Sequence, residues 1–429
     1  MKVLWLVFLG LLLGVVSAYT SWLVIPAVIA FLVFAVFYFK KSELVLLAII
    51  LLRPSMEYVR DVDILAIGPF GFNLNWILAF LIISLCFLHL VKNKFNVFNY
   101  SISLPYLSFL TVCVVSMINS HYLSDSVVEF FRAASIFMLL LLVADWFKGE
   151  TSGRAVTTVI LLSALAPLVA GLHQLATGQG MGYGISRIYG FSAPVSHSHF
   201  LMIISLLSIV LFMQEKSLKF RIFYGAVIVA SIVSMIYTFA RSTYIGLVLS
   251  LLIIGVLRYR KLLVLLLVAL LLVSLNPTLS KRFSVLISSE SVDISLESRL
   301  ILWHGMKDYI LSSPILGNGF GSFTPSSEKY VGYSMTPHSG FIKIFSEVGV
   351  VGLLLYMWVL LILLKKSYLV YMKSDSPFFK DISLVCLTLM LSNILINTFQ
   401  NTFFMPLYQF DLWILFGIVY SLDSAKTRT

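Results

Sequence analysis

The sequence predicts an all-α integral membrane protein, a bundle of 12–14 transmembrane helices that forms one domain over residues 1–429. Hydrophobic residues make up 60% of the chain and charged residues 11%, whereas soluble domains contain roughly 45–50% and 25%. Apolar runs long enough to approach a membrane span recur from the first residue to the last. Stretches such as LVLLLVALLLVSL do not alternate between apolar and polar residues, so the spans are predicted to be helices.

Fourteen apolar segments are the candidate spans. They are 3–19, 22–39, 43–52, 74–91, 104–118, 127–147, 156–176, 199–213, 222–238, 241–257, 262–275, 341–364, 382–398 and 407–422. Several are shorter than the ~20 residues that cross the hydrocarbon core, 43–52 above all, so the predicted count is 12–14. The first segment also ends in small residues suited to signal-peptide cleavage, but a second span begins at Trp22, so we expect it to be retained.

The distribution of positive charge predicts the orientation. The chain has 30 Lys and Arg against 19 Asp and Glu. With a cytoplasmic N-terminus, eleven cations fall on the outer side: Arg53, Arg60, Arg132, Arg187, Arg241, Lys281, Arg282, Arg299, Lys307, Lys329 and Lys343. The other nineteen lie in inner loops, so both termini are predicted to be cytoplasmic. This bias accounts for most of the net charge of +11 and gives no indication of a nucleic-acid partner.

The longest polar stretch, 276–340, is a predicted outer loop between two spans, and long loops of this kind are usually functional. Its segment 297–311 mixes apolar and charged residues in a way that predicts a helix at the membrane interface. The glycine cluster 317–321 has neither a preceding strand nor a following Lys-Ser/Thr, so it predicts a tight turn rather than a nucleotide loop.

Three outer residues are candidates for chemistry. His338 lies between Pro337 and Ser339 at the mouth of a helix, where a histidine acts either as a structural hydrogen bonder or as a catalyst. Arg241 is flanked by apolar sequence; an arginine at a helix centre costs roughly 2.5–3.5 kcal/mol, so such residues usually face a protein interior or a watery cavity. The alternative is an arginine that snorkels from a hairpin end. Arg187 lies in a glycine- and histidine-rich outer segment.

Motifs of soluble enzymes are absent from the sequence. His197 and His199 have no third ligand at a recognisable spacing, so no zinc site is predicted. No GxSxG motif occurs that would indicate a serine hydrolase. We therefore expect no metal and no cofactor.

Several segments resemble the O-antigen ligase and O-antigen polymerase superfamily of membrane glycosyltransferases. His338-Ser339, then nine residues, then Gly349-Val350-Val351-Gly352 is similar to the histidine motif of the ligases. Residues 240–243, Ala-Arg-Ser-Thr, resemble the segment that opens a span in the family. Residues 299–303 together with 313–321 resemble its "R…W…NPLxGxGxG" stretch. The resemblance covers about 187–422, a little over half of the chain.

The resemblance implies a reaction and a set of site residues. The family's donor is a glycan on undecaprenyl diphosphate at the outer side of the bacterial inner membrane. Arg187 and Arg241 would bind the diphosphate with their guanidinium forks, with support from Arg299 and Ser339. His338 would be the general base, so that transfer is metal-independent and inverting.

We expect the ligase reaction, with the polymerase reaction as the alternative. A ligase would transfer the glycan to lipid A-core, whereas a polymerase would extend a growing glycan. A transporter of lipid-linked glycans is the alternative from another class, in which the arginines would line a path; no internal inverted repeat supports it.

Overall fold

The computed structural model describes residues 38–59, 63–67, 70–93, 95–180, 186–275 and 289–426. Nearly all of the first two predicted spans therefore lies outside the described residues, as do Arg60, Lys281 and Arg282. The chain divides into two compact units, residues 1–50 and 51–429. All the contacts discussed below lie within the second unit.

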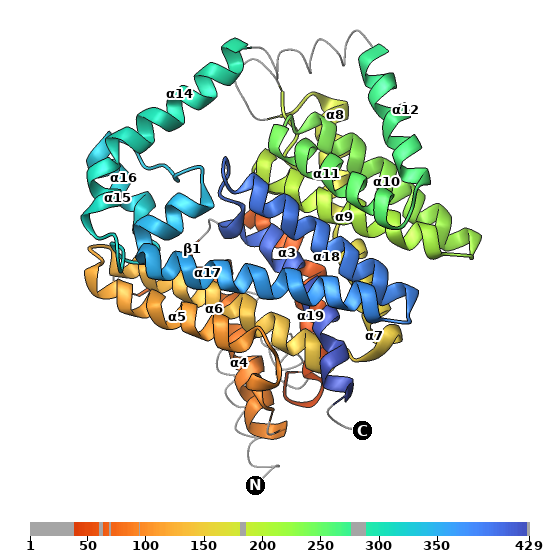
Figure 1. The fold of residues 1–429 in the computed structure, drawn as a ribbon, viewed down its shortest axis with the longest axis horizontal. Helices are drawn as coiled ribbons and strands as arrows, with labels where there is room; N and C mark the ends of the chain where they lie inside the picture. The colour runs from red at the N-terminus through yellow and green to blue at the C-terminus, as the bar shows by residue number, and fades with distance from the viewer. Residues whose placement is uncertain are drawn as a thin grey trace, which may run out of the picture. The chain divides into compact units, whose positions relative to one another are not determined.

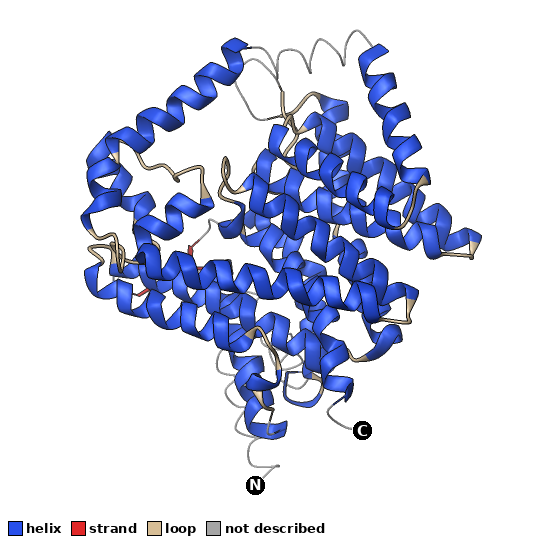
Figure 2. Cartoon of the chain, in the orientation of Figure 1, coloured by secondary structure: helices blue, strands red, loops and turns tan. Residues whose placement is uncertain are grey.

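The all-α prediction is confirmed, and Figure 2 shows helices over most of the described chain. The first helices are α3 Ser42–Met56, α4 Leu74–Asn93, α5 Ser103–Ser116, α6 Leu123–Trp146, α7 Gly149–Ser163, α8 Leu165–Thr177, α9 Pro194–Gln214 and α10 Leu218–Tyr237. The later helices are α11 Arg241–Leu257, α12 Lys261–Leu275, α14 Ser289–Gly305, α15 Lys307–Ser312, α16 Phe323–Val331, α17 Gly340–Lys373, α18 Pro377–Ile396 and α19 Pro406–Lys426.

Short elements connect some of these helices. They are the 3-10 turns η1 Glu57–Val59, η2 Val97–Asn99, η3 Met117–Asn119 and η4 Thr402–Phe404, and the strands β1 Asp63–Ile67 and β2 Phe70–Asn73. The strands pair as an antiparallel hairpin with Ile67 opposite Phe70. This hairpin was not predicted from the sequence.

Within the described residues, seven helices are long and apolar enough to cross a membrane, when α7 and α8 are taken together as Gly149–Thr177. Three shorter apolar helices accompany them: Ser103–Asn119, Arg241–Leu257 and Pro406–Leu422. These findings confirm a polytopic helical membrane protein. The helix at the predicted span 43–52 has only 15 residues, or about 22 Å, which is less than the ~30 Å of hydrocarbon.

The predicted span 156–176 consists of two helices that meet at Ala164. Pro167 lies in the first turn of α8 and has no N–H to donate to the carbonyl of Ser163. The missing hydrogen bond explains the interruption, which hydropathy alone does not reveal.

The predicted span 341–364 is likewise broken. The backbone of α17 is non-helical at Gly349, where φ is 71° and ψ is −172°. The segment before α16 fills the break: Val350 N donates to Pro314 O at 2.8 Å, and Gly319 N donates to Glu347 O at 3.0 Å. The glycine cluster is a tight turn, as predicted, since Gly317, Gly319 and Gly321 all have positive φ. It satisfies backbone groups that the broken helix leaves without partners.

Gly349→Ala should destabilise the protein strongly. A Cβ at this position would lie 2.1 Å from Ile315 O, in addition to the left-handed φ. Gly332→Ala is the matched control, because its φ is +83° but nothing lies within 4 Å of the new Cβ. We expect Gly332→Ala to lose only the ~1–2 kcal/mol of backbone strain and Gly349→Ala to lose more, measured as the free energy of unfolding in detergent. Equal losses would contradict the docking of segment 314–319.

Polar contacts at the helix ends agree with the predicted alternation of the spans. At one end, the Asp381 carboxylate accepts hydrogen bonds from Gln214, Arg258 and Tyr259, all in predicted inner loops or at their edges. At the other end, Asn119 Nδ2 donates to Gly317 O at 3.1 Å, and both residues are predicted to be outer. Helices α17 and α18 run side by side between these ends (Figure 1). Which end faces the periplasm stays a prediction.

Cysteine labelling tests that orientation. A thiol-reactive, membrane-impermeant probe added to sealed cells should modify Ser334→Cys, on the exposed side of the loop before α17, and should spare Ser217→Cys between α9 and α10. The native cysteines Cys86, Cys113 and Cys386 are buried, so their background labelling should be low. Labelling of Ser217→Cys but not of Ser334→Cys would reverse the topology.

Candidate functional site

The turn that carries His338 is held from two sides. His338 has a φ of 51°, a left-handed conformation that is rare outside glycine. Trp303 Nε1 in α14 donates to Pro337 O at 2.7 Å, and Gly340 N donates to Asn397 O at 3.0 Å at the end of α18. Strained backbone of this kind persists only where its surroundings fix it, and it is typical of functional sites.

Ser339 is the N-cap of α17. Its Oγ accepts a hydrogen bond from Ile342 N and donates one to Asn397 O at 3.1 Å. Because both contacts are internal to the protein, they assign Ser339 a supporting role in fixing the His338 turn. They do not place its hydroxyl toward a substrate.

The imidazole of His338 is half-buried, and no residue in the described part of the chain hydrogen-bonds to it. Burial lowers the pKa of His338 below its usual 6.5, and the nearby positive charge of Arg299 lowers it further. The imidazole is therefore neutral at neutral pH. A neutral imidazole with a vacant nitrogen is suited to accept a proton.

Arg187 is fixed against the turn between α10 and α11. Its Nε donates to Thr238 O at 2.7 Å, and Ile188 N donates to Tyr237 O at 3.2 Å. In that turn Phe239 has a φ of 53°, and Arg241 follows as the first residue of α11. The turn thus brings two arginines that are far apart in sequence to the same helix end.

Electrostatic interactions join the predicted residues into one site. Burial lowers the pKa of Arg187, and the positive charge of Arg241 lowers it as well. The pKa of Arg299 is lowered for the same two reasons. Arg241 therefore lies within electrostatic range of Arg187 and of Arg299, and Arg299 lies within range of His338, so the interactions link Arg187, Arg241, Arg299 and His338 in a chain. We call these four residues the basic cluster.

Among the described outer cations, Arg187 and Arg299 differ from Arg53, Arg132 and Lys343 in having no acidic partner. Arg53 pairs with Glu57 at 2.6 Å, Arg132 with Glu129 at 2.5 Å and Lys343 with Glu347 at 2.5 Å. Among the described residues, no carboxylate forms an ion pair with Arg187 or Arg299. Positive charges held near one another favour the binding of an anion.

Sequence reasoning missed two amides that hold the site. Gln174 in α8 accepts hydrogen bonds from Tyr189 N and Gly190 N and donates to Gly190 O at 2.8 Å, so it fixes the segment that carries Arg187. The buried side chain of Asn397 accepts from Phe403 N at 3.1 Å and fixes the turn that holds Gly340. In the sequence, each is marked only as an uncharged amide within an apolar segment. Candidate residues chosen by their charge do not include such amides.

His197 and His199 are buried in the first turns of α9. The Nδ1 of His199 lies 2.8 Å from Val195 O and 3.2 Å from Thr243 Oγ1. The described residues contain no group of three or more His, Cys, Asp or Glu side chains that is arranged to hold a metal ion. The contact with Thr243 connects α9 to α11, two residues after Arg241.

In a comparison with protein families, residues 225–357 match the model described as O-antigen ligase. About a third of the chain is therefore similar to the O-antigen ligase family. The match extends from α10 into α17 and includes Arg241, Arg299 and His338, whereas Arg187 lies before it. No curated protein matches the chain.

This match confirms the resemblance seen in the sequence. It implies an enzyme of the glycosyltransferase type embedded in a membrane, in agreement with the helices described above. The matched segment contains both the break at Gly349 and the turn of His338, so the family motif coincides with the part of the fold that positions the histidine.

Proposed function

We propose that the protein is an O-antigen ligase that transfers a glycan from undecaprenyl diphosphate to a hydroxyl of lipid A-core at the periplasmic face of the bacterial inner membrane. The observation that carries this proposal is the basic cluster, which gathers three arginines near a neutral histidine. Among the described residues, no carboxylate pairs with Arg187 or Arg299. Such a site suits a diphosphate donor and a hydroxyl acceptor together.

In the proposed reaction, Arg187 and Arg241 bind the diphosphate, and Arg299 extends the positive surface toward His338. Displacement of the sugar leaves the electron pair of the broken bond, and the negative charge that develops with it, on the diphosphate oxygen. Preplaced guanidinium groups there stabilise the transition state more than the ground state. The arginines carry this charge, so no divalent metal ion is required.

The acceptor oxygen forms the new bond to the anomeric carbon as the bond from that carbon to the diphosphate oxygen breaks. His338 takes the proton of the acceptor hydroxyl, and undecaprenyl diphosphate leaves. Because one displacement occurs at the anomeric carbon, its configuration is inverted. The products are the glycosylated acceptor and the lipid diphosphate.

The acceptor is tested with purified protein, lipid-linked glycan and lipid A-core. Gel analysis of the products should show glycan attached to the core. A ladder of longer lipid-linked glycans with unmodified core would instead make the protein a polymerase. Transfer to neither acceptor, with movement of intact donor across vesicles, would favour the transporter.

The pH dependence of transfer should reveal the ionisation of His338. The pKa of His338 is lowered, so its neutral, proton-accepting form persists below the usual 6.5 and is lost only as the pH falls through the lowered value. We expect kcat/KM to rise with pH through one ionisation with an apparent pKa below 6.5. Arg299→Met should raise that apparent pKa, because it removes the neighbouring charge. Lys307→Met, at an exposed cation of the same loop, is the control and should leave the profile unchanged.

A further inference from the structure

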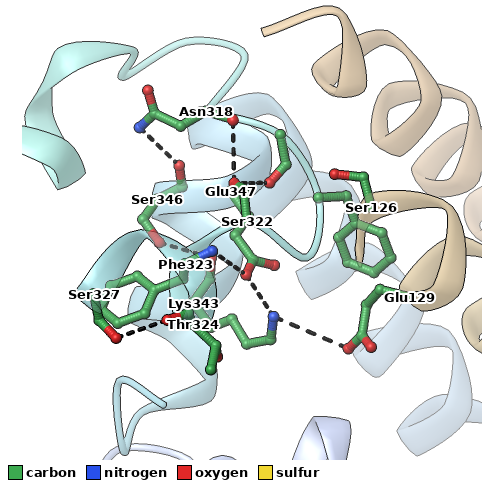
Figure 3. Close-up of polar contacts among 12 residues, drawn as sticks. Ser126, Glu129, Asn318, Ser322, Phe323, Thr324, Ser327, Lys343, Ser346 and Glu347 are labelled. Atoms are coloured by element: carbon green, nitrogen blue, oxygen red, sulfur yellow. Dashed lines mark hydrogen bonds and ion pairs between the residues drawn. The ribbon is translucent and has the colours of Figure 1, made fainter. Parts of the chain in front are cut away.

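A buried ion pair lies in the first turns of α17, between His338 and the break at Gly349. Lys343 Nζ is 2.5 Å from Glu347 Oε1 and 4.0 Å from Glu129 Oε1 in α6. Figure 3 shows Lys343 between the two carboxylates, with Glu347 also facing the start of α16. Lys343 is 5% exposed and Glu347 is fully buried.

Glu347 contacts segment 317–323, which leads into α16, through both its side chain and its main chain. Its Oε1 accepts a hydrogen bond from Phe323 N, the first residue of α16, at 3.1 Å. Its main-chain oxygen accepts another from Gly319 N at 3.0 Å. A Cβ at Gly317 would lie 2.2 Å from the carbonyl carbon of Glu347, so the two backbones approach closely.

Phe323 connects this contact to the helix that bears Arg299. Its ring packs in a small core with Leu302, Met306 and Tyr309, against which Trp303 also packs. Leu302 and Trp303 lie within one turn of Arg299 on α14, and Trp303 hydrogen-bonds to Pro337 beside His338. A continuous set of contacts therefore leads from Glu347 through Phe323 to Arg299.

We propose that Glu347 is a positioning residue that holds Arg299 beside His338, by accepting the hydrogen bond of Phe323 N and so fixing α14–α16 on α17. This inference rests on the proposed function. Lys343 compensates the charge of the buried carboxylate, since an unpaired charge at this depth would be costly. Glu347 acts through Phe323 and Arg299 and does not touch the reacting atoms.

Two double variants separate hydrogen bonding from charge. Lys343→Met with Glu347→Gln removes both charges and keeps an oxygen that can accept from Phe323 N. Lys343→Met with Glu347→Leu removes both charges and that acceptor. We expect the Gln variant to keep at least about half of wild-type kcat, and the Leu variant to lose about tenfold in kcat with KM for the lipid-linked donor changed less than about threefold.

A distance measurement tests the position of the loop without reference to activity. Spin labels are placed at Lys307 on α15 and at Met372 near the far end of α17, both of them exposed. Wild type and the Gln variant should give the same narrow distance distribution, and the Leu variant a broadened or shifted one. If the Leu variant is poorly inserted, Glu347→Asn with Lys343→Met replaces it, because its amide is one carbon too short to reach Phe323 N.

An unchanged distance distribution in the Leu and Asn variants would overturn the proposal, as would equal losses of kcat in the Gln and Leu variants. These results are distinguishable from failure of the proposed function. If the protein did not transfer glycans at all, the distances would still report whether Glu347 positions the loop.

Discussion

His338→Ala should insert and fold normally, bind the lipid-linked donor and transfer almost no glycan. Loss of a general base typically costs ~10²–10⁴-fold in rate. His338 lies in a loop and none of the described residues hydrogen-bonds to its imidazole, so its removal breaks no such bond. His304→Ala is the matched control, because His304 is an exposed histidine on α14 and should retain full transfer. The measurement is single-turnover transfer by purified protein, with donor binding measured in parallel.

Retention of more than about a tenth of wild-type transfer by His338→Ala would assign His338 to positioning, because that loss is below the range for a general base. The proton acceptor would then be sought elsewhere. Glu347 is excluded by its complete burial and its contacts with Lys343 and Phe323. The exposed carboxylate of Asp308 and the phosphates of the acceptor would remain.

Arg187→Lys and Arg241→Lys should each lose most of the transfer activity while the protein stays folded. Lysine keeps one positive charge but loses the planar fork that binds two phosphate oxygens at once. Arg187 would also lose the donor at Nε that bonds to Thr238 O. We expect a loss of about tenfold or more in kcat/KM for each variant, which corresponds to one bidentate contact of ~1.4 kcal/mol or more.

Arg132→Lys is the control for these two variants. Arg132 is also predicted to be outer, but its charge is already paired with Glu129 at 2.5 Å. The lysine at this position should keep the pairing and at least half of the activity. Near-normal transfer by both Arg187→Lys and Arg241→Lys would show that neither arginine binds the diphosphate through a fork.

Much of the fold could be predicted because a bilayer imposes a simple rule on sequence. Apolar length identified the segment of every described helix that is long and apolar enough to cross a membrane, except for the details of its ends. The rule says nothing about interruptions. The missing N–H of Pro167 and the positive φ of Gly349 both lie inside segments that hydropathy treats as continuous.

The composition of the basic cluster could also be predicted, since arginines on the side disfavoured by the positive-inside rule need a local reason. Three of those cations have an acidic partner as their reason: Arg53, Arg132 and Lys343. Sequence could not separate them from Arg187 and Arg299, because pairing depends on which helices meet. For the same reason, the roles of Gln174 and Asn397 and the contact of Glu347 with Phe323 could not be predicted from the sequence. Each depends on how separate segments pack against one another.

The central claim is that the basic cluster transfers a glycan from a lipid diphosphate without a metal ion. Release of undecaprenyl diphosphate by the purified protein, measured with and without acceptor in excess chelator, tests it most directly. We expect release that depends on the acceptor, is unchanged by the chelator, and is lost in His338→Ala. Release that stops in the chelator and returns with a divalent cation, or that proceeds equally in His338→Ala, would contradict the claim.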